Sequence, residues 1–418
     1  MQQVKDIDHL FRHQYGKMVA ILTKIFGLPL LETIEDAVQD TFLLAAVKWR
    51  KEIPENPEGW LTTAAKNRVV DLLRKIKAEE GRLAKLQQGT SAISIHQLFL
   101  DHEIEDSQLR MIFTACHPLL KPQDQIAFAL KTIAGFSQKE IATALLLKES
   151  AVKKRLARAR HTIKEQNILF TLPEDASLTK RLHRVHEVIY LIFNEGFHSN
   201  QKELLIQKDL CGEAIRLCKI LLKKETYRTG EGYALFALLC FHTSRLESKT
   251  SKDGKILTLE QQNRALWFKP LIQLGKDALS TSFTYSEITS FHLEASIAYE
   301  HVKATSFATT NWEKIYQLYK SLEKRQSTAF TQLNIAIVLL QLQDYKKVWN
   351  YLQLIDPKAL EQRAYLYFAT LSEYYYHTCT FSLAISSLEK ALEMTCNKQE
   401  KDYLLQKKAT LEERLHKN

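Results

Sequence analysis

The chain has 418 residues, 45% of them hydrophobic and 25% charged, a length that excludes a single comfortable hydrophobic core. Its formal net charge of +10 favours a polyanionic partner. With only 12 Gly and 8 Pro, and with Leu, Ala, Lys and Glu throughout, turn-forming residues are scarce and helix formers abundant. We therefore expect an all-α protein of two or more domains.

The cysteines and the apolar runs indicate where the protein resides. The six cysteines are scattered, without a CxxC pair, in apolar helical context that suits reduced thiols. The longest apolar run, Tyr233 to Phe241, is too short to span a bilayer, and the N-terminus lacks a basic region followed by an apolar core. We expect a cytoplasmic protein, neither secreted nor inserted in a membrane.

The chain divides into segments of different character. Helical periodicity up to about residue 77 predicts a first helical domain, residues 1–77. Residues 78–105 contain Gly81 and Gly89 and few periodic positions, so we expect a linker. A small second domain, residues 106–166, and a helical extension, residues 167–418, complete the chain.

A weak repeat from about residue 311 indicates a solenoid within the extension. Asn311, Asp344 and Thr380 each open an amphipathic stretch, at offsets of 33 and 36 residues. Spacing near 34 is typical of tetratricopeptide-like hairpins, which bury their apolar faces only against their neighbours. The aromatic residues of this part are expected to fill the seams between stacked helices, rather than a peptide groove: Tyr365, Tyr367, Tyr374, Tyr375 and Tyr376.

The strongest local signature is a helix-turn-helix in the second domain. Ser137 is a good N-cap, and Glu140, three residues later, completes a capping box. After Leu145-Leu146-Leu147 a second helix follows, for which Ser150 is the expected cap. Apolar positions line one side of that helix, and the other side presents four cations that can contact phosphates and base edges in a major groove: Lys153, Lys154, Arg155 and Arg158.

Two further polar stripes lie in the first domain. Asp36, Gln39 and Asp40 share one face of an amphipathic helix, a surface suited to a basic protein partner. After a loop flanked by Pro54 and Pro57, Asn67, Asp71 and Arg74 recur at i, i+4 and i+7, opposite Leu61, Ala65, Val69 and Leu72.

These stretches, in this order, resemble regions two and four of extracytoplasmic-function sigma factors over nearly all of residues 1–166. The resemblance implies that Asp36, Gln39 and Asp40 dock on the clamp coiled coil of core RNA polymerase. Asn67, Asp71 and Arg74 would face the melted minus-ten promoter element, and the loop from Lys51 to Pro57 would hold a flipped base. The four cations of the second domain would face the minus-thirty-five element. Lys66 stands where an arginine commonly precedes the Asn.

The extension resembles that of sigma factors with a tetratricopeptide-like tail. The stretches concerned are Ile192 to Phe197, Leu210 to Leu217, Asp253-Gly254, and Leu259 to Arg264 with Trp267. Asn263 stands where these proteins usually carry Asp. The resemblance implies regulation by the tail, through an intramolecular contact or a regulatory protein. Core RNA polymerase and promoter DNA are the expected partners, with no membrane partner and no cofactor.

Other function classes remain as alternatives. His183 and His186 lack the HExxH order of a metal site, and Cys116 beside His117 lacks a third catalytic group, so we expect no enzyme, no catalytic residue and no metal. The rival function is a helix-turn-helix repressor or a scaffold with a peptide-binding tetratricopeptide domain. Such repressors usually dimerise on two half-sites.

Overall fold

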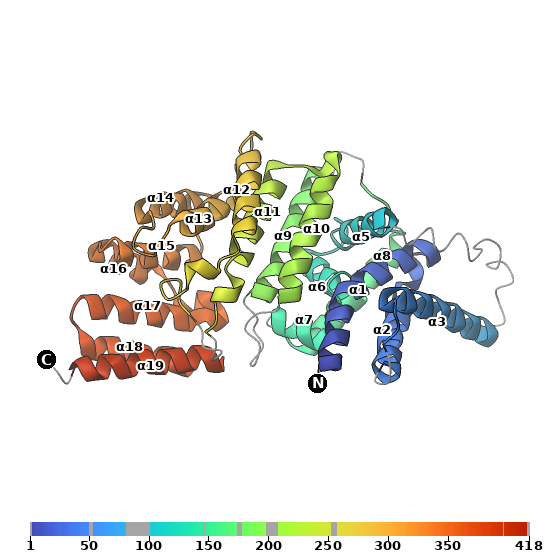
Figure 1. Cartoon of the computed structure of the whole chain (residues 1–418), viewed down its shortest axis with the longest axis horizontal. Coiled ribbons are helices and arrows are strands. Elements are labelled where there is room, and N and C mark those ends of the chain that lie inside the picture. The colour runs from blue at the N-terminus through green and yellow to red at the C-terminus, as the bar shows by residue number, and fades with distance from the viewer. Residues whose placement is uncertain are drawn as a thin grey trace. The chain divides into compact units, whose positions relative to one another are not determined.

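The computed structural model describes residues 2–49, 53–80, 101–145, 147–173, 178–197, 208–251, 257–395 and 397–415. Within these ranges the chain is helical and contains no β-strand, which confirms the all-α prediction. It divides into two compact units, Met1–Gly196 with Gln207–Tyr227, and Phe197–Ile206 with Arg228–Asn418 (Figure 1). None of the described helices is long and apolar enough to cross a membrane.

The first unit contains the helices of both predicted N-terminal domains. They are α1 (Gln2–Phe26), the 3-10 turn η1 (Leu28–Leu30), α2 (Leu31–Lys48), α3 (Pro57–Glu80), α5 (Asp101–Ala115), α6 (Pro122–Thr132), α7 (Gln138–Ala144), α8 (Glu149–Glu165), α9 (Leu178–Phe197), α10 (Lys208–Lys223) and η2 (Glu225–Tyr227). Both ends of the predicted linker are helical, since α3 runs to Glu80 and α5 begins at Asp101; residues 81–100 lie outside the described ranges.

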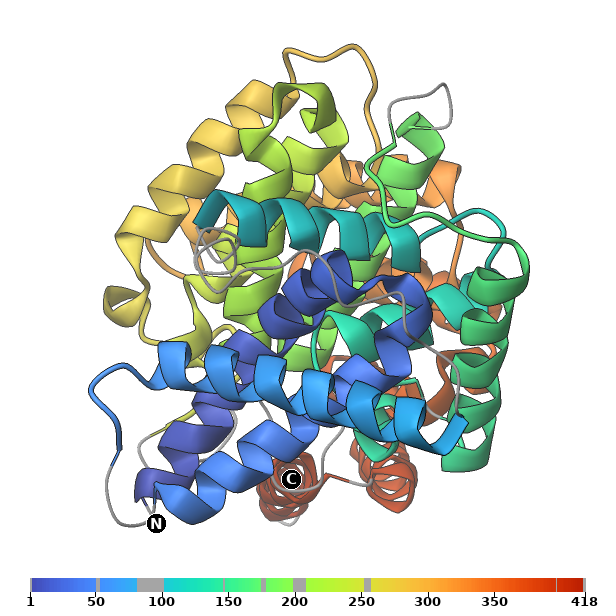
Figure 2. The ribbon, with the colours of Figure 1, turned by 90° about the vertical axis from the view of Figure 1, so that its right-hand side faces the viewer.

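Helices α1, α2 and α3 pack against one another as a bundle (Figure 2). The apolar positions predicted for α3 explain this packing, because Leu61, Ala65 and Val69 are fully buried. The Asn56 side chain begins α3 by accepting a hydrogen bond from the Gly59 backbone N–H at 2.9 Å. The polar faces of α2 and α3 are therefore held on a preformed scaffold.

Helices α9 and α10, which the sequence analysis assigned to the extension, belong to the first compact unit. Arg216 of α10 donates to the Gln108 side chain of α5 at 2.9 Å, and the Phe113 ring lies 5.1 Å from that of Tyr227. Lys224 forms an ion pair with Asp106, which together with Arg110 holds the pKa of this carboxyl below its usual value despite partial burial. The domain boundaries drawn from the sequence stay a prediction.

The second unit is built from helix pairs. Its elements are α11 (Gly230–Thr243), η3 (Leu246–Ser248), η4 (Arg264–Leu266), α12 (Lys269–Ser282), α13 (Ser290–Lys303), α14 (Trp312–Arg325), α15 (Ala329–Gln341), α16 (Tyr345–Leu354), η5 (Pro357–Arg363), α17 (Ala364–His377), α18 (Phe381–Met394) and α19 (Lys398–Leu415). Consecutive helices from α13 to α16 and from α17 to α19 pack side by side.

The weak repeat corresponds to real helix starts. Asn311, Asp344 and Thr380 directly precede α14, α16 and α18. Asn311 and Asp344 also cap their helices, accepting backbone N–H bonds at 2.9 and 3.1 Å. The positions in register are buried in all three helices, at Ile315, Val348 and Ala384. These buried positions are compatible with the predicted stacking of hairpins.

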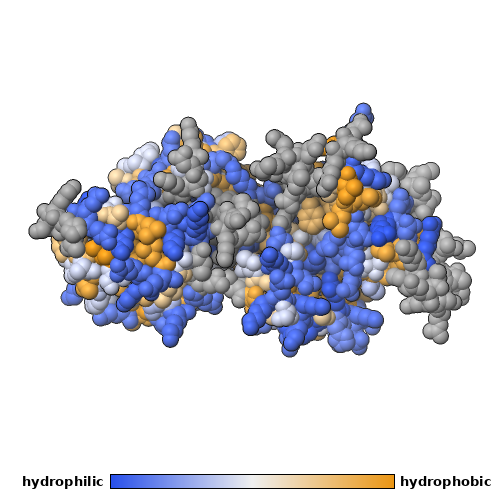
Figure 3. Space-filling model, turned by 90° about the horizontal axis from the view of Figure 1, so that it is seen from below, coloured by the Kyte–Doolittle hydropathy of each residue, from blue (hydrophilic) through white to orange (hydrophobic). Residues whose placement is uncertain are grey.

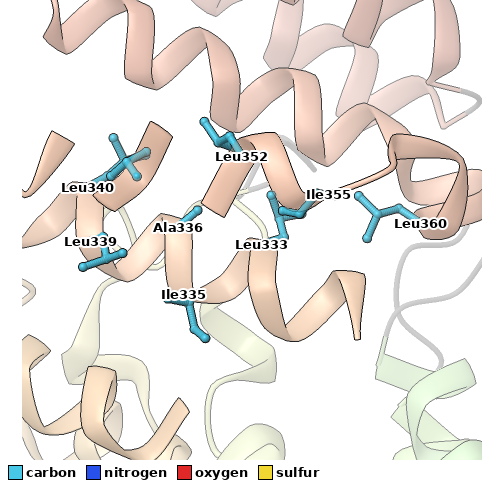
Figure 4. Close-up of a cluster of buried hydrophobic side chains, with 9 residues drawn as sticks. Leu333, Ile335, Ala336, Leu339, Leu340, Leu352, Ile355 and Leu360 are labelled. Carbon is cyan, nitrogen blue, oxygen red and sulfur yellow. The ribbon is translucent and has the colours of Figure 1, made fainter. Parts of the chain in front are cut away.

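Leucine-rich packing between α15, α16 and η5 forms the core of this stack (Figure 4). The aromatic residues surround that core: Tyr367 and Tyr374 pack against it, and Trp349 stacks on Tyr374 with ring centroids 5.3 Å apart. Tyr365, Tyr375 and Tyr376 pack against the next cluster, between α17, α18 and α19. The expectation that these rings fill the seams between stacked helices is confirmed.

Hydrophobic side chains also reach the surface of the second unit, including Leu383, Met394 and Leu405. Exposed hydrophobic residues are visible among hydrophilic ones in Figure 3.

Candidate polymerase and DNA interfaces

The helix-turn-helix forms as the capping signal predicts. The Ser137 hydroxyl accepts the Glu140 backbone N–H at 3.2 Å, and the Glu140 carboxylate accepts the Ser137 N–H at 2.8 Å. The predicted cap of the second helix is wrong, since α8 begins at Glu149 with Lys148 as N-cap. Ser150 therefore lies inside the first turn, where its hydroxyl is not the N-cap.

Helix α8 buries one face and exposes the other, as the periodicity predicts. Val152, Leu156 and Ala159 are fully buried. Lys153 and Lys154 are exposed, and no ion pair holds either side chain among the described residues. Two lysines on the solvent side of this helix provide strongly hydrated positive charges suited to phosphate contacts.

The two arginines predicted for the same face are already engaged. Arg158 forms a two-pronged ion pair with Asp124 of α6, with Nη2–Oδ1 at 2.6 Å and Nε–Oδ2 at 3.1 Å. These bonds raise the pKa of the Arg158 guanidinium. Arg155 lies 3.5 Å from the Gln123 carbonyl oxygen. Of the four cations predicted for this face, Lys153 and Lys154 are therefore available, whereas Arg155 and Arg158 contact α6 and hold α8 against it.

The predicted docking face on α2 is partly paired. Asp36 is exposed, and Asp40 accepts two bonds from Arg68 of α3, at 2.6 and 3.0 Å. Partial burial and the neighbouring Glu32 carboxylate raise the pKa of Asp36, with a further contribution from Asp40. Gln39 is half-buried. A carboxylate-rich surface is therefore present on α2, and a basic partner would relieve the repulsion within it.

The predicted minus-ten stripe lies on the solvent side of α3. Asn67, Asp71 and Arg74 are all exposed, and Arg74 lies 3.5 Å from Asp71 in a weak, solvent-exposed pair. Of the loop predicted to hold a flipped base, Ile53 to Asn56 are described, while Lys51 and Glu52 lie outside the described residues.

One contact that the sequence analysis missed joins the predicted polymerase-binding helix to the predicted DNA-binding helix. Arg160 of α8 donates to Glu35 of α2 at 2.5 Å, and the Glu35 side chain is only 2% exposed. Arg160 also lies 3.4 Å from Glu32. The signal was available in the sequence, because Glu35 shares a helix face with Leu31, Val38 and Phe42, where a carboxylate is unexpected.

The Glu35 end of this pair is buried. Burial raises the pKa of Glu35, against the favourable fields of Arg160 and Lys131, and lowers the pKa of Lys131. Loss of Arg160 would leave the buried Glu35 carboxylate without a compensating charge, which is strongly destabilising. The pair therefore helps to hold α8 on α2.

Two glycines bring the same elements into close approach. A Cβ at Gly16 of α1 would overlap the carbonyl oxygen of Ile133 and lie 3.0 Å from its carbonyl carbon. Gly135 has a φ of +71°, and a Cβ there would meet the Tyr15 ring at 2.9 Å. Helix α1 and the α6–α7 turn are therefore in direct backbone contact.

The residues considered for enzymatic chemistry have other surroundings. His183 lies 3.5 Å from Glu187 in a partly exposed i, i+4 pair, and His186 is buried. Burial raises the pKa of the Cys116 thiol to about 12, so it is unreactive as a nucleophile at neutral pH. In the described ranges, no group of three or more His, Cys, Asp or Glu is placed to hold a metal ion.

A helix-turn-helix with exposed lysines on its second helix, joined to a helical bundle with a carboxylate surface, is typical of a DNA-binding protein. Sigma-70 region 2 matches residues 10–79, and sigma-70 region 4 matches residues 110–163. The chain therefore belongs to the sigma-70 family of sigma factors, DNA-binding proteins of transcription initiation that recognise promoters.

The similarity to known proteins extends beyond these two regions. Residues 181–283 match a family of unknown function, DUF6596. Uncharacterized protein R00370 of Rhizobium meliloti (strain 1021) is 30% identical over 344 residues, which cover 81% of this chain and 80% of that relative. No solved structure matches the chain.

Proposed function

We propose that this chain is an extracytoplasmic-function sigma factor whose α1–α3 bundle binds core RNA polymerase and opens the minus-ten element. The helix-turn-helix would hold the upstream promoter element, and the second compact unit would regulate activity. The observation that supports this most strongly is the order of the two sigma-70 regions along the chain, with exposed Lys153 and Lys154 on the second helix of the helix-turn-helix.

The upstream contact is tested first at the lysines. Replacing Lys153 and Lys154 with Ala leaves the Arg158–Asp124 brace intact, so the fold of α8 should persist. If both lysines contact phosphates, the slope of log affinity against log salt falls by about 1.8, at roughly 0.9 per contact. Promoter-dependent run-off transcription with bacterial core polymerase should drop sharply, while polymerase binding stays unchanged.

A matched control is Lys219→Ala, which removes an exposed lysine from α10 in the same unit. Its transcript level and salt slope should equal those of the wild type. Unchanged run-off transcription by the double lysine variant would refute the assignment of α8 as the upstream reader.

The polymerase contact is tested by reversing charge on α2. Asp36→Lys places a cation on the surface expected to meet a basic partner, and Asp36 is exposed, so folding should be preserved. A pull-down with purified core polymerase should show loss of binding, whereas Glu225→Lys, an exposed control in the same unit, should bind normally. Equal retention of both variants would refute docking through α2.

The same pull-down separates this proposal from the rival repressor or scaffold. A repressor of that kind binds a paired site as a dimer and does not retain core polymerase. Specific retention by wild-type protein, together with monomeric binding to an asymmetric promoter, would favour the sigma factor. Failure to bind core polymerase, or to direct it to any start site, would refute the sigma factor proposal.

The role of the extension is tested by truncation at the boundary between compact units. Cutting after Glu165 would remove α9 and α10, which pack within the first unit, so the cut belongs after Tyr227. Higher transcription by residues 1–227 than by the full chain would indicate an inhibitory tail, and lower transcription an assisting one.

A further inference from the structure

Two arginines lie over the indole of Trp267 in the second unit, apart from the residues proposed to bind polymerase or DNA. The guanidinium of Arg264 lies 4.5 Å from the ring centroid, and that of Arg245 lies 6.0 Å from it. Trp267 is 4% exposed, and its Nε1 donates to the Ser248 hydroxyl at 2.8 Å, which fixes the ring. Two guanidinium groups therefore share one rigid aromatic platform.

Three separate segments bring these groups together. Arg245 lies in the turn between α11 and η3, and Arg264 begins η4, where the Asn263 side chain accepts the Ala265 N–H at 3.0 Å. His301 lies in the last turn of α13. We call Arg245, Arg264 and His301 the basic cluster, whose positive charge lies on the two arginines.

The hydrogen bonds of the cluster leave donors unused. Arg264 Nη1 donates to the carbonyl oxygens of His301 and Ala304, at 2.6 and 2.7 Å, at the end of α13. Its Nη2 is buried without a partner, and so is Nδ1 of His301. Arg245 Nη2 lies 3.2 Å from His242 Nδ1. Buried polar atoms normally find hydrogen-bond partners, so these two unpartnered nitrogens need an explanation.

The charges are equally unbalanced. Within the described ranges no carboxylate forms an ion pair with Arg245, Arg264 or His301. Burial, reinforced by the neighbouring Arg264, lowers the pKa of Arg245 to about 10, so it stays charged at neutral pH. Burial and the two arginines lower the pKa of His301 to about 3. Desolvated cations are normally paired with anions.

We propose that Arg245, Arg264 and His301 form a binding site for a small oxyanion ligand, one that bears a phosphate or carboxylate group. Guanidinium groups present paired donors in a planar fork that matches both groups. The ligand would accept hydrogen bonds from the unused donors and neutralise the positive charge of the cluster. Its binding would thereby stabilise the second unit. This inference concerns the second unit alone and does not depend on the sigma factor assignment.

The test uses the full chain and measures binding by titration calorimetry and thermal stability by scanning calorimetry. Inorganic phosphate and pyrophosphate form one arm, acetate and citrate the other, and sodium chloride of equal ionic strength is the reference. We expect at least one arm to bind and to raise the transition temperature of the second unit. Binding by phosphates alone identifies a phosphate-bearing ligand, and binding by carboxylates alone a carboxylate-bearing one.

Arg245→Met is the principal variant, because it removes a cation that has no carboxylate partner among the described residues and keeps an unbranched apolar side chain. Without ligand its transition temperature should not fall, whereas anion binding should weaken about tenfold or more. Arg245→Lys keeps the charge and loses the fork, so it should bind with intermediate affinity. The control is Arg325→Met, an exposed arginine at the end of α14, which should bind as the wild type does.

Three results would overturn the proposal. One is that no oxyanion stabilises the chain more than chloride does. Another is that Arg245→Met binds as tightly as the wild type. The third is that Arg325→Met loses binding to the same extent as Arg245→Met, which would indicate unspecific screening of positive charge.

Discussion

Because α1 lies close to the α6–α7 turn, replacing a helical glycine with alanine should have opposite effects on stability at two positions. Gly16 of α1 is buried against the Ile133 carbonyl, whereas Gly212 of α10 is exposed and a Cβ there meets nothing within 4 Å. Both lie in the first compact unit. We compare Gly16→Ala with Gly212→Ala.

The expected magnitudes follow from the contacts. Gly→Ala in a helix stabilises by about 0.5–1 kcal/mol through lower backbone entropy in the unfolded chain. At Gly212 nothing opposes this gain. At Gly16 the added methyl group overlaps backbone atoms that cannot rotate away, so the cost of overpacking lies in the upper part of its usual range, at about 2–3 kcal/mol. Against a gain of about 1 kcal/mol, the net loss is about 1–2 kcal/mol.

Scanning calorimetry measures both variants on the same transition. For a unit of this size, 1 kcal/mol shifts the midpoint by about 2–4 °C. Gly212→Ala should therefore raise the transition of the first unit by about 1–4 °C, and Gly16→Ala should lower the same transition by about 2–8 °C. If Gly16→Ala raises that transition as Gly212→Ala does, α1 does not contact the α6–α7 turn as described.

Three further predictions address the first unit and the thiols. Arg160→Met should destabilise α2 and α8 by about 3 kcal/mol at pH 7, measured by hydrogen exchange against the exposed control Lys154→Met. Because burial raises the pKa of Glu35, its ionised form opposes folding, so this loss should shrink as the pH falls toward the ordinary value of the carboxyl; an equal loss at pH 5 would contradict the buried pair. Ser137→Ala should destabilise the helix-turn-helix by about 1 kcal/mol in thermal denaturation, while Ser150→Ala should be near neutral; the reverse order would reject the observed caps. Iodoacetamide at pH 8 should alkylate exposed Cys379 and spare buried Cys116, whose pKa is about 12, as read by peptide mass spectrometry; modification of Cys116 in folded protein would show that its pocket opens.

Much of this protein is determined by its sequence alone, because the signals concerned are local. Helical periodicity identifies the buried faces of α3 and α8, and the Ser137–Glu140 capping box marks the start of α7 without reference to any other segment. The repeat of Asn311, Asp344 and Thr380 likewise predicts the first residues of three stacked helices. Exposure of Asn67, Asp71 and Arg74 follows from the same periodicity.

Only the tertiary structure decides which of these polar side chains are available and which are already paired. Arg158 and Arg160 both belong to the basic helix α8, yet Arg158 meets Asp124, 34 residues earlier in the chain, and Arg160 meets Glu35, 125 residues earlier. Periodicity assigns a side chain to a face and gives no information about what lies opposite it. Pairing across such distances depends on how separate helices pack. For the same reason the sequence does not reveal the two arginines around Trp267, which have no carboxylate partner among the described residues.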